Sequence, residues 1–190
     1  MSVRLAAGFL LLWLPSLPAL AASFTLTPGQ IAEATRVGQQ SVASQEFGTE
    51  WEVANEKGET LTVLTPFHRV ALAARNAAFK NDTVKPREVE AILKNHQGRL
   101  SFRAALRGSR ADFARWYQPV LLTPRDAELK PSFVQNERTA LRLEDGQYLA
   151  RCLYVFPAEG FSPGGRVTVL IRDRQNRNVS RFTVDLSTIR

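Results

Sequence analysis

The stretch YLARCLYVF, residues 148–156, decides the fold because it is apolar on both faces of a strand. Successive side chains of a strand point to opposite faces of the sheet. One face carries Tyr148, Ala150, Cys152, Tyr154 and Phe156, and the other carries Leu149, Leu153 and Val155. Only Arg151 interrupts the pattern, which is typical of a central strand covered from both sides. We therefore expect residues 148–156 to lie at the centre of a sheet, with Cys152 buried as a small hydrophobe.

The segments around this strand repeat the two-residue period. In residues 99–107, apolar side chains alternate with mostly polar ones; the apolar set is Leu100, Phe102, Ala104 and Leu106. Residues 166–172 and 179–186 predict a hairpin with the tip DRQNRN at residues 173–178. Residues 109–117 leave two alternatives open: a helix capped at Ser109, or a strand with a core tryptophan that ends at Pro119. The region 99–190 is thus predicted to be mainly β.

The first half of the chain contains three patterns that predict the start of a helix. Thr27-Pro28-Gly29-Gln30 matches a capping box with proline at the first helical position. Thr65-Pro66 opens a second helix by the same cap-then-proline pattern. A third helix begins at Pro86 and ends before Gly98. Residues 23–98 are therefore predicted to be mainly helical.

One short hairpin interrupts this helical region. Strand-like runs at 51–54 and 60–65 flank the turn-forming segment Asn55-Glu56-Lys57-Gly58. The predicted fold class is α+β, with N-terminal helices followed by an antiparallel, β-sandwich-like sheet of Greek-key, immunoglobulin-like type. The length of residues 23–190 suits a single globular domain.

Residues 1–22 have the three parts of a secretory signal peptide. Arg4 supplies a positive start, residues 5–14 (LAAGFLLLWL) form a short apolar run, and residues 19–22 (ALAA) offer small residues for cleavage. The run is shorter than the ~20 residues that a membrane span needs; a retained N-terminal anchor is the alternative. No cysteine follows the small residues, which argues against a lipoprotein. We expect a periplasmic or secreted protein without a transmembrane segment.

The charge is distributed unevenly. Residues 23–66 contain six acids and two bases, whereas residues 67–190 contain 12 acids and 22 bases. Four arginines surround the tip of the C-terminal hairpin, with only Asp173 opposing them: Arg172, Arg174, Arg177 and Arg181. Such a tip would bind an acidic envelope protein, an anionic polymer or a lipid headgroup, whereas export makes nucleic acid a poor partner. The alternatives are a solvated tip that protects a sheet edge and an arginine excess set by a GC-rich genome.

The catalytic motif in the chain and its two histidines lack the partner groups that catalysis or metal binding requires. Residues 160–164 (GFSPG) match the nucleophile elbow G-x-S-x-G, but Pro163 lacks the backbone N–H that must face the oxyanion. No histidine follows Ser162, as that triad order requires. His68 and His96 have no partners at metal-ligand spacing. We predict no catalytic residue, metal or cofactor.

An aromatic pair and the single cysteine are assigned to the interior. Trp116-Tyr117 could stack on sugars, but packing in the core is the favoured interpretation. Cys152 is the only cysteine, which excludes an intramolecular disulfide. The sequence leaves the oligomeric state open.

Two sets of residues resemble known families. Residues 65–75 (TPFHRVALAAR), Lys130-Pro131, residues 145–148 (DGQY) and residues 185–187 (DLS) are similar to small exported bacterial proteins that have no assigned activity. This resemblance carries no catalytic residues. Residues 143–152 (LEDGQYLARC) resemble the corner before strand F of immunoglobulin-like sandwiches, where a tyrosine hydroxyl bonds back to the backbone.

The match to that corner is imperfect. Tyr148 lies four residues before Cys152, where immunoglobulin domains have a spacing of two, and no second cysteine is present. The resemblance therefore implies a Greek-key sandwich rather than true membership of the immunoglobulin family.

These observations favour a non-enzymatic interaction or accessory protein that uses its basic hairpin against an acidic partner or envelope surface. The rival is a hydrolase whose site assembles only in three dimensions, with His68, Asp112 or Ser162 available for it. A third class, the structural subunit of an envelope complex, would expose a large apolar patch.

Overall fold

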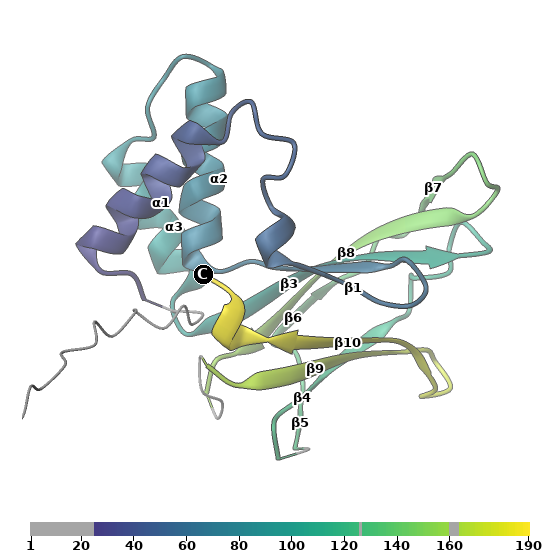
Figure 1. Ribbon diagram of the computed structural model, residues 1–190. Helices are drawn as coiled ribbons and strands as arrows, with labels where there is room; N and C mark the ends of the chain where they lie inside the picture. The colour runs from purple at the N-terminus through teal and green to yellow at the C-terminus, as the bar shows by residue number, and fades with distance from the viewer. Residues whose placement is uncertain (1–24, 126, 160–163) are drawn as a thin grey trace, which may run out of the picture.

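The computed structural model describes residues 25–125, 127–159 and 164–190. These residues form three α-helices and two antiparallel sheets, so the chain is of mixed α+β class (Figure 1). The predicted signal peptide and Ser162 lie outside the described residues. Within the described ranges, no helix is long and apolar enough to cross a membrane.

The three predicted helices are confirmed: α1 (Pro28–Gln40), α2 (Pro66–Phe79) and α3 (Pro86–His96). The capping box of α1 is formed, because the Gln30 N–H donates to the Thr27 hydroxyl while the Gln30 side chain accepts the Thr27 N–H at 2.9 Å. Helices α1 and α2 pack closely at Gly38, where a Cβ would lie 2.1 Å from the Ala71 carbonyl oxygen. Only glycine permits this approach.

The larger sheet has the strand order β1–β2–β3–β8–β6, and β7 also pairs with β8. Its strands are β1 (Glu52–Ala54), β2 (Thr60–Val63), β3 (Arg99–Gly108), β6 (Phe133–Gln135), β7 (Leu141–Arg142) and β8 (Tyr148–Pro157). The smaller sheet has the order β10–β9–β4–β5. Its strands are β4 (Gln118–Leu122), β5 (Glu128–Leu129), β9 (Arg166–Arg172) and β10 (Asn178–Asp185).

The two sheets lie as layers in Figure 1, and one cluster of buried side chains joins them. The larger sheet contributes the alternating residues of β3 and β8, all of which are buried: Leu100, Phe102, Ala104, Leu106, Ala150, Cys152, Tyr154 and Phe156. The smaller sheet contributes Leu121, Val167, Val169, Ile171, Phe182 and Val184. The predicted hairpin, the central position of β8 and the burial of Cys152 are confirmed.

Two expectations need correction. The second face of β8 is only partly covered, because Leu149, Leu153 and Val155 are half-buried rather than packed under a second layer. Residues 109–117 are neither helix nor strand but a series of turns. These turns fold back on β3, since a Cβ at Gly108 would lie 2.3 Å from the ring of Phe113.

Helical structure is also less confined to the N-terminal part than expected. A short 3-10 helix, η2 (Leu186–Thr188), follows β10. The hairpin β1–β2 lies between α1 and α2, where it was predicted. A second 3-10 turn, η1 (Thr49–Trp51), leads directly into β1. The three α-helices gather at one end of the sheets, which we call the helical end (Figure 1).

Candidate functional site

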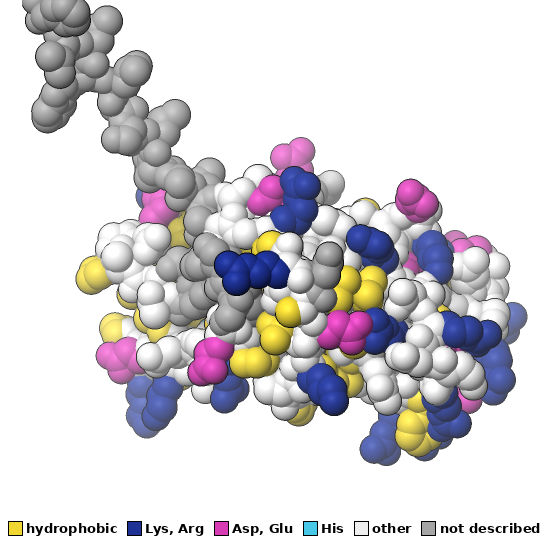
Figure 2. Space-filling view, turned by 90° about the horizontal axis from the view of Figure 1, so that it is seen from below, with side chains coloured by type: hydrophobic (Ala, Val, Ile, Leu, Met, Phe, Trp, Pro, Cys, Tyr) yellow, Lys and Arg dark blue, Asp and Glu magenta, His cyan; other side chains and the backbone are white. Residues whose placement is uncertain are grey.

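Four connecting segments meet at the opposite end of the sheets, which we call the loop end: residues 55–59, 108–117, 143–147 and 173–177. Strand pairing brings them together. Gly108 at the end of β3 pairs with Tyr148 at the start of β8, and Arg172 at the end of β9 pairs with both Gln118 and Asn178. Figure 2 shows Lys and Arg side chains gathered at the right-hand end of that view, which is the loop end.

Two of the four predicted arginines are neutralised by acids. The Arg172 guanidinium donates to both Glu128 carboxylate oxygens, at 2.5 and 3.2 Å, and its side chain is only 17% exposed. The Arg177 Nε donates to Asp173 at 2.8 Å. These hydrogen bonds hold the pKa values of Glu128 and Asp173 below their usual range. The charges of Arg172 and Arg177 are therefore neutralised by acids of the protein itself.

The other two predicted arginines lie in separate surroundings. Arg181, on β10, lines a shallow groove of about 420 Å³ beside the β1–β2 turn. The Arg174 guanidinium carbon lies 4.0 Å from the centre of the Trp116 ring, and that of Arg115 lies 5.1 Å from it. The structure thus does not bring the four hairpin arginines together, and it adds two residues that the hairpin pattern did not include.

We call Arg115, Trp116 and Arg174 the Arg–Trp platform. The Trp116 side chain is 50% exposed, which makes the expectation that it packs in the core wrong. The adjacent Tyr117 turns inward and is half-buried. Among the described residues, neither Arg115 nor Arg174 forms an ion pair with an acid. The platform therefore presents an aromatic face and two unneutralised charges to solvent.

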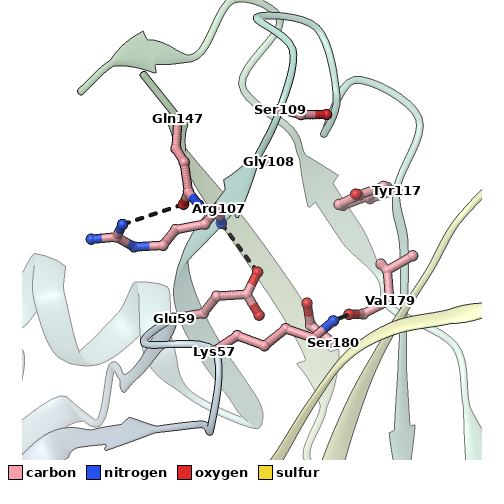
Figure 3. A pocket seen from close by; sticks show the side chains of 9 residues that line it. All are labelled: Lys57, Glu59, Arg107, Gly108, Ser109, Tyr117, Gln147, Val179 and Ser180. Atoms are coloured by element: carbon pink, nitrogen blue, oxygen red, sulfur yellow. Dashed lines mark hydrogen bonds between the residues drawn. The ribbon is translucent and has the colours of Figure 1, made fainter. Parts of the chain in front are cut away.

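A pocket of about 490 Å³ opens beside the platform. Figure 3 shows its lining, which comes from the β1–β2 turn, the end of β3, the following turns, the β7–β8 turn and the start of β10. Glu59 lines this pocket and is only 3% exposed. One of its carboxylate oxygens accepts the Arg107 backbone N–H at 3.1 Å, and the other accepts the Asn55 side-chain N–H at 2.8 Å.

The cations near Glu59 are directed elsewhere. The Lys57 ammonium donates to the Val179 carbonyl oxygen, and the Arg107 guanidinium pairs with Asp145 at 3.1 Å. Burial, and then the nearby Glu59 charge, raises the pKa of Tyr117, so its hydroxyl stays protonated across the neutral range. Sequence reasoning missed Glu59, because a carboxylate next to a turn carries no signal of burial.

The two described residues available to a hydrolase, His68 and Asp112, lie at opposite ends of the sheets. His68 belongs to the helical end, where its ring centre lies 4.6 Å from that of Trp51 and burial lowers its pKa to about 4. Asp112 lies in the turns of the loop end, in an exposed pair with Arg110. His96, at the end of α3, is half-buried, and burial lowers its pKa as well. Within the described ranges, no group of three or more His, Cys, Asp or Glu side chains is arranged to hold a metal ion.

Comparison with known proteins adds no relative: the chain matches no family model, no curated protein and no solved structure. The resemblances to exported bacterial proteins and to immunoglobulin-like sandwiches therefore stay predictions.

Proposed function

We propose that this protein is an exported, non-enzymatic binding protein that contacts an anionic polymer of the cell envelope through the Arg–Trp platform. The observation that carries the proposal is the half-exposed Trp116 ring, which has the guanidinium carbons of Arg174 and Arg115 at 4.0 and 5.1 Å from its centre. No acid of the described residues forms an ion pair with either group. We further propose that the two facing sheets form a Greek-key sandwich that serves as a rigid support for the loop end. Export rests on the signal-peptide pattern of residues 1–22.

The chemistry of the platform supports this choice of ligand. A guanidinium group stacked on an aromatic ring is oriented in advance, so that less freedom is lost when it binds a carboxylate or phosphate. The indole face offers a flat apolar surface on which a sugar ring of a polysaccharide would lie. Tryptophan and arginine also dominate the energetic centres of protein interfaces. An anionic polysaccharide would engage the ring and both charges at once.

This proposal shifts the binding site within the basic region. The hairpin contributes Arg174, but Arg172 and Arg177 are paired with acids and serve to fix the hairpin tip. Arg115 and Trp116 come from the turns after β3 instead.

Binding of the mature protein to dextran sulfate tests the proposal, with neutral dextran as the reference polymer. We expect the affinity for dextran sulfate to fall steeply between about 50 mM and 200 mM salt, because binding releases counterions. Trp116→Ala and Arg174→Ala should each weaken binding about tenfold, which corresponds to ~1.4 kcal/mol.

Arg181→Ala is the matched control, since it removes one positive charge of the same hairpin away from the platform. It should change the affinity less than about twofold, which is under ~0.5 kcal/mol. An equal loss in Arg181→Ala and Arg174→Ala, or equal binding of neutral dextran, would show that the platform is not the site.

A further inference from the structure

We infer that the pocket at Glu59 binds a primary ammonium group, carried by a small organic amine or by a lysine side chain. This pocket differs from the Arg–Trp platform in the charge of its ligand and in the residues that would bind it. Glu59 is a carboxylate that is 97% buried and yet lines a pocket open to solvent.

The Glu59 carboxylate has unused hydrogen-bonding capacity. An ionised carboxylate offers about four acceptor positions. The structure fills two of them with neutral donors, the Arg107 backbone N–H and the Asn55 side-chain amide. Buried carboxylates are normally paired with a cation, because an uncompensated charge in the interior is costly. The site therefore lacks the positive partner that its burial favours.

The nearest cations of the chain do not supply this partner. Lys57 lies two residues before Glu59, but its ammonium donates to the Val179 carbonyl oxygen. The Arg107 side chain extends away from Glu59, toward Asp145 and Gln147. Across the described part of the chain, Glu59 takes part in no ion pair.

The rest of the pocket suits an ammonium group rather than a metal ion. Figure 3 shows Glu59 on one side of the pocket and Tyr117 on the other. The hydroxyl-bearing residues of the lining are Ser109, Tyr117 and Ser180. An ammonium has three N–H donors, so one can reach Glu59 while hydroxyl oxygens accept the others. Sites for divalent metal ions usually combine carboxylates with carbonyl oxygens and waters. Glu59 is the one carboxylate in the described lining, which matches the single charge of an ammonium group.

The volume sets the size of the ligand. A space of about 490 Å³ lies within the range of small-molecule pockets. The aliphatic chain of the amine would pack on Val179 and the ring of Tyr117, which also attracts a cation over its face.

The test is a titration of the mature protein with n-butylammonium, with n-butanol as the uncharged probe of similar shape. Binding is followed by the amide signals of Ser109, Gln147 and Ser180 in two-dimensional NMR spectra. We expect millimolar affinity for n-butylammonium and no shift with n-butanol. The amide of Nα-acetyl-lysine separates the two sources: tighter binding than n-butylammonium indicates a lysine of a protein partner, and weaker binding a free amine.

Glu59→Gln removes the charge but keeps an oxygen for the Arg107 N–H, and it should lower the affinity at least tenfold. Lys57→Ala is the matched control, because it removes a neighbouring charge of the opposite sign and should leave the affinity unchanged or raise it. Equal binding by wild type and Glu59→Gln would overturn the proposal and leave Glu59 as a clamp between the β1–β2 turn and β3.

A second variant keeps the test decisive if Glu59→Gln does not fold. Tyr117→Phe removes one hydroxyl acceptor from the pocket and should weaken n-butylammonium binding severalfold. Binding of n-butylammonium no stronger than that of n-butanol in the wild-type protein would also overturn the proposal. Loss of dextran sulfate binding in Trp116→Ala would have no bearing on it.

Discussion

The two ends of the sheets use the same contact, a guanidinium over an aromatic ring, in opposite ways. At the helical end, the Arg190 guanidinium carbon lies 5.1 Å from the centre of the Phe67 ring. Two nitrogens of the same group donate to the Glu50 carboxylate at 2.8 and 2.9 Å. At the loop end, Arg174 lies over Trp116, and no acid among the described residues pairs with it. The first contact is neutralised and covers the core, whereas the second leaves charge and ring available to a ligand.

The tryptophans of the two ends show the same contrast. Trp51 is 0% exposed, and its indole N–H donates to the Arg190 carbonyl oxygen at 2.7 Å. This contact holds the C-terminal segment against the start of α2, where the Thr65 hydroxyl donates to the same oxygen. Trp116 has half its surface in water. A cation–aromatic contact thus indicates a binding surface only where the ring is exposed and the cation is unpaired.

Replacing the two tryptophans by alanine should give the largest difference in stability between the two ends. Trp51→Ala should lower the free energy of unfolding by about 3–5 kcal/mol, because it empties a fully buried site and leaves a carbonyl oxygen without its donor. Trp116→Ala should lower it by only about 1 kcal/mol, the size of exposed cation–aromatic contacts. Urea denaturation of both variants measures the difference. Equal losses would mean that Trp116 is part of the structural framework.

The free energy of unfolding should depend on pH through His68, which is buried at the helical end. Burial, together with repulsion from Arg69, Arg103 and His96, lowers the pKa of His68 to about 4. The contribution of uncharged His68 to the free energy of unfolding is fully present above the unfolded pKa of 6.5. It is lost as the pH falls from 6.5 to about 4. A shift of this size corresponds to about 3 kcal/mol.

His68→Phe is the control for this loss, because it keeps an aromatic ring against Trp51 and cannot be protonated. Its free energy of unfolding, measured by urea denaturation at intervals between pH 7 and pH 4, should fall less steeply than that of the wild type. Parallel curves for the two proteins would show that His68 is not the group responsible.

Local patterns predicted the framework well because its rules act over a few residues. The Thr-Pro starts of α1 and α2 depend on backbone donors within the first turn. The alternation of β3 places Leu100, Phe102, Ala104 and Leu106 on one face whatever else the chain does. The extent of cover over β8 was less predictable, because it depends on which elements pack on its second face.

The candidate sites were not predictable in the same way, because each depends on partners far along the chain. Arg172 was predicted to bind an anionic partner, but the fold places Glu128 of β5 against it. Trp116 is exposed because Phe113 and Tyr117, rather than Trp116, pack against the core. Glu59 is buried because β3 supplies the Arg107 N–H that it accepts. The basic hairpin was a partial guide, since one of its four arginines belongs to the platform.

The most direct test is an NMR titration of the mature protein with short dextran sulfate chains at low salt. We expect the backbone amide shifts to concentrate in residues 109–117 and 173–177, with α1 and α2 unchanged, and to disappear in Trp116→Ala. Shifts centred on the helical end, or spread equally over both ends, would contradict the assignment of binding to the loop end.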